Sequence, residues 1–172
     1  MSVDDFKAKL QGGGARPNLF RVICNFPTFA GGDVELTSFL CKAASLPASV
    51  IANIDVPYRG RMVKFAGDRT FEPWNLTIIN DNNMSIRNAF ETWMNAICEH
   101  QGNVGILNPS DYMVDMAVEQ LDRQENVVKR YDIRSAFPAN VSAIDLAYDT
   151  NDTIEEYTVE IQYNYWEAAT TS

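Results

Sequence analysis

The clearest hydrophobic pattern of the chain lies between Thr153 and Trp166. Apolar and polar side chains alternate there: Tyr157, Val159, Ile161, Tyr163 and Tyr165 take every second position, and Glu156, Thr158, Glu160, Gln162 and Asn164 stand between them. This period of two is typical of a half-buried β-strand. Because a slip of one residue would expose all five apolar groups, the register is strongly specified and the strand needs partners or a covered edge. We therefore expect a substantial antiparallel sheet organised around this strand.

Shorter alternating runs predict the remaining strands. We expect them at 20–26, 34–41, 50–57, 61–66, 74–78, 112–118, 127–133 and 144–148. Clusters of glycine, proline, asparagine and aspartate predict turns at 27–32, 66–71, 122–126, 137–140 and 149–152. The first two runs are expected to form one hairpin, and those at 112–118 and 127–133 another. Such an order of strands and turns favours a predominantly antiparallel fold.

One stretch predicts a long helix. Its apolar side chains recur at helical spacing on a stripe wide enough to lie on a sheet: Ile86, Ala89, Phe90, Trp93 and Ile97. A short helix is expected at 3–10, and the glycines that follow it, Gly12, Gly13 and Gly14, predict that 1–15 forms a mobile N-terminal arm. No linker divides the chain, so we expect a single domain over 1–172. Its fold class is mainly β, an antiparallel β-sandwich or partly rolled barrel with one flanking α-helix.

The composition is that of a domain that folds without covalent cross-links. With 172 residues, of which 46% are hydrophobic, the chain can bury an ordinary core. The odd number of cysteines, Cys24, Cys41 and Cys98, argues against a secreted disulfide framework and favours a reducing cytoplasm. We find neither the apolar run of a signal peptide nor an uncharged stretch long enough to span a bilayer. We expect no export and no membrane partner.

The charge is acidic and unevenly distributed. The chain has 23 acidic against 14 basic residues, a net charge of −9, which opposes stable binding of a polyanion. No lysine or arginine follows Arg134, whereas acidic residues gather there: Asp145, Asp149, Asp152, Glu155, Glu156, Glu160 and Glu167. Basic residues crowd near the middle of the chain: Arg59, Arg61, Lys64 and Arg69. This asymmetry indicates either pairing between adjacent strands of one molecule or complementary surfaces of neighbouring copies.

No constellation of residues predicts an enzyme. His100 is the only histidine, which excludes zinc sites that need several imidazoles and leaves no second one for a proton relay. Glu155 and Glu156 are adjacent on a strand and point to opposite faces, so they are poor partners for acid–base chemistry. No phosphate-binding glycine motif is present. We expect no enzymatic activity, no metal and no cofactor, and we expect Trp74 and Trp93 in the core.

Short motifs spread from end to end of the chain carry a family resemblance. They are RPNLF at 16–20, CKAASLPA at 41–48, AGDRTF at 66–71 with Trp74 behind it, QGN at 101–103, FPANV at 137–141 and YWE at 165–167. Their order and spacing resemble the major tail tube protein of contractile-tailed bacteriophages. The loops at 27–33 and 105–111 depart from the family pattern.

The resemblance implies a structural subunit of the virion, made in the cytoplasm of the host bacterium. Copies would form hexameric rings that stack into a hollow tube inside a contractile sheath, and phage DNA would pass through without specific binding. The implied partners are further copies of the chain, the tail sheath protein, and baseplate and tail terminator proteins. The alternatives are a baseplate protein that initiates the tube, a tube subunit of a related injection system, and, from a different class, a monomeric β-sandwich binding module with exposed tryptophan and tyrosine.

Two sets of residues are the candidate functional positions. The polar face of the last strand, with Glu156, Glu160, Gln162 and Asn164, is expected to line the lumen, because an acidic face without bases repels phosphate. Contacts between copies are expected at the glycine arm and the basic stretch: Gly12, Gly13, Gly14, Arg59, Arg61, Lys64, Asp68 and Arg69. Ring closure would also give each edge strand a neighbour.

Overall fold

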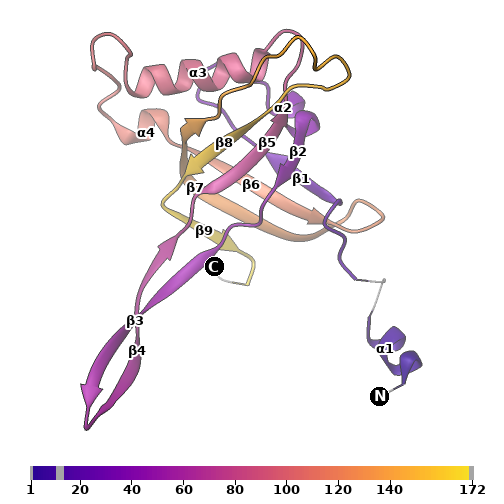
Figure 1. The fold of residues 1–172 in the computed structure, drawn as a ribbon, viewed down its shortest axis with the longest axis vertical. Helices are drawn as coiled ribbons and strands as arrows, with labels where there is room; N and C mark the ends of the chain where they lie inside the picture. The colour runs from indigo at the N-terminus through magenta and orange to yellow at the C-terminus, as the bar shows by residue number, and fades with distance from the viewer. Residues whose placement is uncertain (1, 11–13, 171–172) are drawn as a thin grey trace.

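The computed structural model describes residues 2–10 and 14–170; residues 1, 11–13, 171 and 172 lie outside the described part (Figure 1). In chain order the elements are α1 (Val3–Lys9), β1 (Phe20–Ile23), α2 (Val34–Leu40), β2 (Cys41–Ala44), β3 (Ser49–Tyr58), β4 (Arg61–Phe71), β5 (Trp74–Ile79), α3 (Ser85–Ile97), α4 (Pro109–Tyr112), β6 (Val114–Leu121), β7 (Val127–Val141), β8 (Glu156–Gln162) and β9 (Tyr165–Ala168). All the strand pairs are antiparallel. The predicted mainly β class is confirmed.

The main sheet has seven strands in the order β1-β6-β7-β8-β5-β2, and β9 adds to β7. Strand β7 belongs to both halves of this sheet, because it pairs with β6 and β9 along 127–136 and with β8 along 137–141. Ser135, with a positive φ of 56°, and a register shift between Pro138 and Asn140 mark where it bends. The two halves face each other across one core, so the sandwich or partly rolled barrel is confirmed. The turn expected at 137–140 is wrong, since the chain bends there without leaving the strand.

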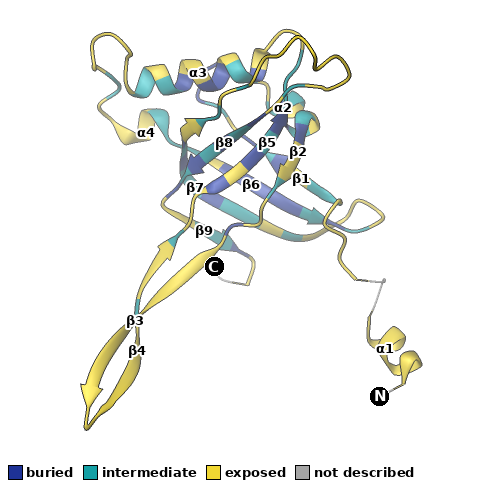
Figure 2. Ribbon diagram, in the orientation of Figure 1, coloured by how far each residue is buried: buried dark blue, intermediate teal, exposed yellow. Residues whose placement is uncertain are grey.

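The core lies between the two halves and under α3 (Figure 2). Trp74 and Trp93 are buried as expected, and each indole N–H donates to a backbone carbonyl, of Ser45 at 2.6 Å and of Tyr112 at 2.8 Å. The predicted helical stripe of α3 is buried at Ile86, Ala89, Phe90 and Trp93. The flanking helix therefore seals the core along one side of the sandwich.

The alternation near the C-terminus is confirmed in β8, where Tyr157, Val159 and Ile161 are buried. They pair with β5 in the register Ile78↔Tyr157, Leu76↔Val159 and Trp74↔Ile161. A single strand over 153–166 is wrong, because the chain breaks after Gln162 and resumes as β9. The physical reason is the bend in β7: both strands pair with β7, on either side of that bend, and no straight strand can follow it.

Two other segments differ from the expected strands. The segment 34–41 is mostly helix α2, because the Asp33 side chain caps the helix by accepting from the backbone N–H groups of Glu35 and Leu36. Strand β1 therefore pairs with β6 and forms no hairpin with this segment. The segment 144–148 is a loop with Leu146 and Tyr148 exposed, and no described strand pairs with it. Alternation of apolar residues was present in both segments, but among the described residues no strand pairs with 144–148, and only Cys41, at the end of 34–41, pairs with a strand.

Candidate assembly surfaces

The β3–β4 hairpin projects from the body of the molecule as a separate two-stranded sheet (Figure 1). Its two-residue turn has positive φ at both Arg59, 47°, and Gly60, 82°, which is the backbone geometry that matches the twist of a hairpin. All residues from Ser49 to Ala66 are exposed, and Figure 2 shows most of the hairpin in the colour of exposed residues. The hairpin is thus supported by the body only at its base.

The expected turn at 66–71 is wrong, because β4 runs through it to Phe71. Gly67 lies at a β-bulge instead, since the register of the two strands shifts between Ile51 and Asn53. A Cβ on Gly67 would lie 2.9 Å from the Ala52 carbonyl oxygen. The glycine therefore permits close approach of two backbones. The hairpin is longer than the sequence predicted, and Asp68 and Arg69 lie on its second strand.

Large apolar side chains cover the hairpin although it has no protein neighbour within the described chain. Eight are at least 41% exposed: Val50, Ile51, Ile54, Val56, Tyr58, Met62, Val63 and Phe65. An isolated hairpin is marginally stable in water, and a contiguous apolar surface of this kind marks an interaction site. The hairpin has the composition of an element that is buried in an assembly.

The basic residues of the hairpin make no ion pair within the described residues. Arg59 stacks over the ring of Tyr58 at 5.4 Å, and no salt bridge includes Arg61, Lys64 or Arg69. In the body, by contrast, five basic side chains are paired: Arg21, Lys42, Arg87, Arg130 and Arg134. Pairing within one molecule therefore holds only in part: Glu156 and Glu167 of the acidic stretch pair with Lys42 and Arg134, whereas the four bases of the hairpin pair with no acid of the described residues. The expected contacts of Arg59, Arg61, Lys64, Asp68 and Arg69 with a neighbouring copy stay a prediction.

Three of the four residues predicted for the lumen share one polar face of β8. Glu156, Glu160 and Gln162 alternate with the buried residues and lie on the side away from the core. Glu156 pairs with Lys42 of β2, and the Gln162 amide donates to Glu160 at 3.4 Å. Asn164 lies apart from them, in the break between β8 and β9, and is exposed. The two carboxylates thus lie together on one outer surface of the sandwich.

The other outer surface carries a network of ion pairs that sequence reasoning missed. Glu119 of β6 is only 5% exposed and lies between Arg21, at 3.6 Å, and Arg130, at 2.9 Å. Strands β1, β6 and β7 place these three side chains side by side, since Arg21 and Arg130 are both register partners of Glu119. A hydrogen bond to Asp132 is the main cause that raises the pKa of Arg130. The available signal was the run of opposite charges at alternate positions in β6 and β7.

A second part of this network surrounds Arg134. Its guanidinium lies 2.7 Å from Asp115 and 3.2 Å from Glu167 of β9, and hydrogen bonds to these two carboxylates raise its pKa. Desolvation acts to raise the pKa of Asp115, but hydrogen bonds from the Ser135 N–H and from Arg134 outweigh it, so this pKa lies below its ordinary value. The acids on this surface are therefore matched by arginines.

Two sheet edges and the N-terminal helix are also uncovered. Within the described residues, β1 pairs only with β6 and β2 only with β5, so each presents one free edge. Helix α1 has the expected short helical form, capped by Ser2, and buries none of its residues. Gly12 and Gly13 lie outside the described residues, and Gly14 has a φ of 82°. The predicted contact of this arm with another copy is untested.

The described residues offer no metal centre, since no group of three or more His, Cys, Asp or Glu side chains is arranged to hold an ion. Cys24 and Cys41 are buried, and desolvation raises the pKa of Cys41 to about 11. None of the helices in the described part of the chain is long and apolar enough to cross a membrane. The surfaces that distinguish this molecule are thus the bare hairpin, the free edges and the charged faces.

Comparison with known proteins shows the family to which the chain belongs. A family model described as phage tail tube protein matches residues 15–169. The tail tube protein gp19 of Enterobacteria phage T4 is 35% identical over 170 residues, which are 97% of this chain and 100% of that protein. The chain belongs to the phage tail tube protein family. The tail tube protein of Serratia phage KSP90 is 31% identical over 167 residues, 94% of each chain.

Solved structures agree with this fold. A chain of the anti-feeding prophage baseplate superposes with a TM-score of 0.64 at 11% identity, over 90% of this chain and 94% of that one. A chain of the extended sheath–tube complex of the PVC extracellular contractile injection system has a TM-score of 0.60 at 12% identity, covering 98% and 97%. These structures show the fold, and membership of the tail tube protein family makes the protein a structural subunit of a phage tail tube, a component of the virion and not an enzyme. The resemblance predicted from the short motifs is confirmed.

Proposed function

We propose that this tail tube subunit assembles as hexameric rings, and that the rings stack into the inner conduit of a contractile tail. The observation that carries the proposal is the β3–β4 hairpin, which is apolar, exposed and without a partner in the monomer. The free edges of β1 and β2 support ring closure, because neighbouring subunits can join their sheets edge to edge. Stacked rings then bury the hairpin.

We infer that the partners are the sheath, baseplate and terminator proteins of the same tail. Chains with this fold come from a baseplate, from the tube-terminating cap of the anti-feeding prophage and from an extended sheath–tube complex. A tail tube subunit that meets the same three kinds of neighbour would explain why so much of its surface is uncovered in the monomer.

We also propose that the polar face of β8 lines the channel through which DNA passes. Glu156, Glu160, Gln162 and Asn164 are the lumen candidates, and their acids repel phosphate at short range so that the channel does not hold DNA. The β8 face carries one paired base, Lys42 beside Glu156, whereas the opposite surface carries three paired arginines, Arg21, Arg130 and Arg134. The smaller number of cations on the β8 face supports this choice. An assembled tube with these four residues on its outside would overturn the assignment.

A second candidate function is that of the baseplate protein that starts the tube. The observation that favours it is the similarity to the anti-feeding prophage baseplate chain, whose TM-score of 0.64 is comparable to the 0.60 of the sheath–tube chain. An initiator would form one ring and bind a baseplate, whereas a tube subunit would form stacks of many rings. A monomeric binding module has less support, because Trp74 and Trp93 are buried in the core and cannot form an exposed binding face.

The experiment that tests the proposal is negative-stain electron microscopy of the purified protein over a range of concentrations, with light scattering on the same samples. We expect rings with sixfold symmetry and hollow tubes whose mass grows with concentration. Single rings that never stack would favour the initiator. Monomers at every concentration, including in the presence of purified baseplates, would overturn the proposal.

A further inference from the structure

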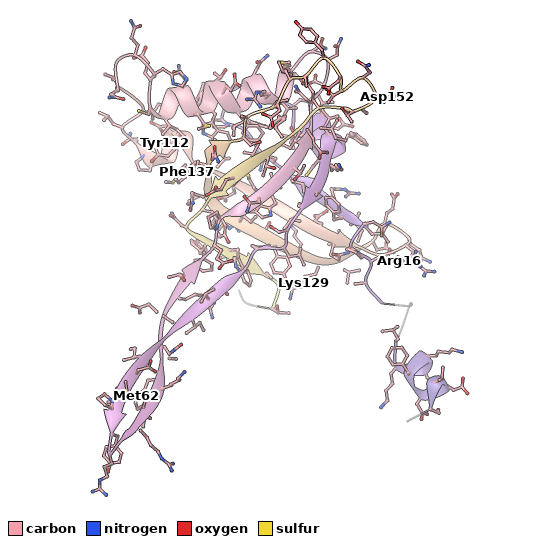
Figure 3. The ribbon with its side chains drawn as sticks, in the orientation of Figure 1. Arg16, Met62, Tyr112, Lys129, Phe137 and Asp152 are labelled. Atoms are coloured by element: carbon pink, nitrogen blue, oxygen red, sulfur yellow. The ribbon has the colours of Figure 1, made fainter. Side chains whose placement is uncertain are left out.

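The loop between β7 and β8 surrounds a hollow at the end of the molecule that is far from the hairpin. Figure 3 labels Asp152 on this loop and Met62 near the tip of the hairpin, and the two lie at opposite ends. The hollow has a volume of about 700 Å³ and is lined by residues 143–148, 150 and 153–156. Leu146, Tyr148 and Ile154 are at least 75% exposed there. The loop thus presents apolar side chains that nothing in the described chain covers.

The loop is also strongly acidic. Residues 143–156 contain five acids and no base: Asp145, Asp149, Asp152, Glu155 and Glu156. Glu156 is neutralised by Lys42, and Glu155 accepts from the Asn80 amide at 3.0 Å. Asp145, Asp149 and Asp152 are exposed and form no ion pair with any described residue. Three uncompensated carboxylates therefore lie on this loop, and one of them, Asp145, lines the hollow.

The hairpin has the complementary properties. Between Ser49 and Phe71 it carries four bases, Arg59, Arg61, Lys64 and Arg69, against two acids, Asp55 and Asp68. Its strand β3 has 10 residues, which at about 3.3 Å per residue reaches about 33 Å beyond the base of the hairpin. Its tip combines Arg59 and Arg61 with Tyr58 and Met62, and the loop combines carboxylates with Leu146 and Tyr148. Both charge and apolar character match.

We propose that the acidic loop 143–156 is the docking site for the β3–β4 hairpin of a second copy of this chain in the next ring. The inference rests on the proposed function, and names the surface that receives the hairpin. Because the two surfaces lie at opposite ends of the molecule, the contact is heterologous and repeats without closing, which produces a stack. The apolar side chains of the tip enter the hollow, while the arginines pair with the exposed aspartates of the loop.

The first test reverses charge on each side in turn. We expect the loop variant Asp145→Lys/Asp149→Lys/Asp152→Lys to form rings but to need an about tenfold or higher protein concentration for tubes, because like charges then face each other. The hairpin variant Arg59→Glu/Arg61→Glu/Lys64→Glu should fail in the same way. Mixed together, the two variants should form tubes again, since each hairpin then meets a loop of opposite charge.

A matched control changes the same amount of charge at other exposed sites. Glu35→Lys/Glu99→Lys/Glu125→Lys also reverses three acids, on α2 and on two loops, and should stack at the wild-type concentration. Wild-type stacking by the loop variant would overturn the docking site, and so would failure of the mixture to restore tubes. If the wild-type protein itself forms neither rings nor tubes, with or without baseplates, the proposed function fails instead.

A second measurement does not depend on the folding of a triple variant. Met62→Cys and Tyr148→Cys, combined in a Cys98→Ser background, put one thiol on the hairpin tip and one on the loop. In assembled tubes, a short bismaleimide should link copies into a ladder of covalent oligomers, and either single variant should give none. Absence of the ladder in tubes that are visible by microscopy would overturn the proposal and leave the loop to a partner other than a second copy.

Discussion

The guanidinium of Arg134 lies 2.7 Å from the carboxylate of Asp115, across the β6–β7 pair. The same carboxylate accepts the backbone N–H of Ser135, at 3.0 Å, at the point where β7 bends. Ser135 holds a positive φ of 56°, so Asp115 secures a backbone conformation that most residues avoid. The ion pair therefore also holds the bend that joins the two halves of the sheet.

Asp115→Asn should destabilise the monomer by about 1 kcal/mol. The lost ion pair with Arg134 contributes little, because solvent screens an exposed pair, and the weakened hydrogen bond from the backbone N–H of Ser135 contributes the rest. This corresponds to a fall in Tm of roughly 2–4 °C for a chain of this size. Thermal unfolding followed by circular dichroism measures it. Asp111→Asn, on a carboxylate without an ion pair among the described residues, is the control and should leave Tm unchanged.

The same group predicts a dependence of stability on pH. The pKa of Asp115 in the folded protein lies below its ordinary value of 3.8, so the unfolded chain takes up a proton first as the pH falls. Its contribution is complete above pH 3.8 and is lost as the pH falls through the folded pKa. Urea unfolding of wild type and Asp115→Asn should show a difference that shrinks below that pH. A difference that stays constant would show that Asp115 contributes through shape alone.

Ile161→Ala should cost about 2–5 kcal/mol, because Ile161 is fully buried opposite Trp74 and its removal leaves a cavity in the core. Thr158→Ala, on the polar face of the same strand, should cost less than about 1 kcal/mol. Chemical denaturation of the monomer separates the two. Equal costs would contradict the assignment of the inner and outer faces of β8.

Gly67→Val should impair assembly more than monomer stability. A Cβ at this position would lie 2.9 Å from the Ala52 carbonyl oxygen, so the bulge of the hairpin has to rearrange. Only Phe71, at the base of the hairpin, packs against the core, so Tm should fall by less than about 2 °C, since surface changes cost little. Tube formation by light scattering is the assay. Ala66→Val, one residue away and exposed, is the control that should form normal tubes.

Glu156→Lys/Glu160→Lys tests the lumen. If these residues face the channel, cations on them will bind phosphate, and assembled tubes should retain short DNA in a salt-dependent way that wild-type tubes do not. Filter binding of a labelled duplex to purified tubes, at low and high salt, gives the answer. The matched variant Glu35→Lys/Glu99→Lys adds the same charge at sites on α2 and beyond α3. Equal retention of DNA by both variants would contradict the assignment of β8 to the lumen.

The sequence predicted those parts of the fold in which local pattern and tertiary partner agree. Ile86, Phe90 and Trp93 have helical spacing and a sheet to cover, and Val159 and Ile161 have alternation and neighbouring strands on both sides. Prediction failed where only the pattern was present. Leu146 and Tyr148 alternate like strand residues but lie beside no strand, and Asp33 caps a helix in a stretch whose residues also suit a strand.

The sequence predicted the charge of the candidate surfaces but not their position in the fold. The crowding of Arg59, Arg61 and Lys64 was visible as a run of charge, but its position on a projecting hairpin depends on where β3 and β4 leave the body. The pairing of Glu119 with Arg21 and Arg130 depends on the register of three strands, two of which are nearly 100 residues apart in the chain. No local pattern carries that register, since it is decided by how the whole sheet packs.

The basic character of the hairpin has a consequence for the subunit before it assembles. A long, exposed pair of strands rich in β-branched and aromatic residues is a template for edge-to-edge aggregation. Two such hairpins bring their arginines and lysine into contact when they approach each other, and Pro57 removes one backbone donor from β3. Identical hairpins therefore repel each other, which opposes edge-to-edge aggregation of subunits that have not yet assembled.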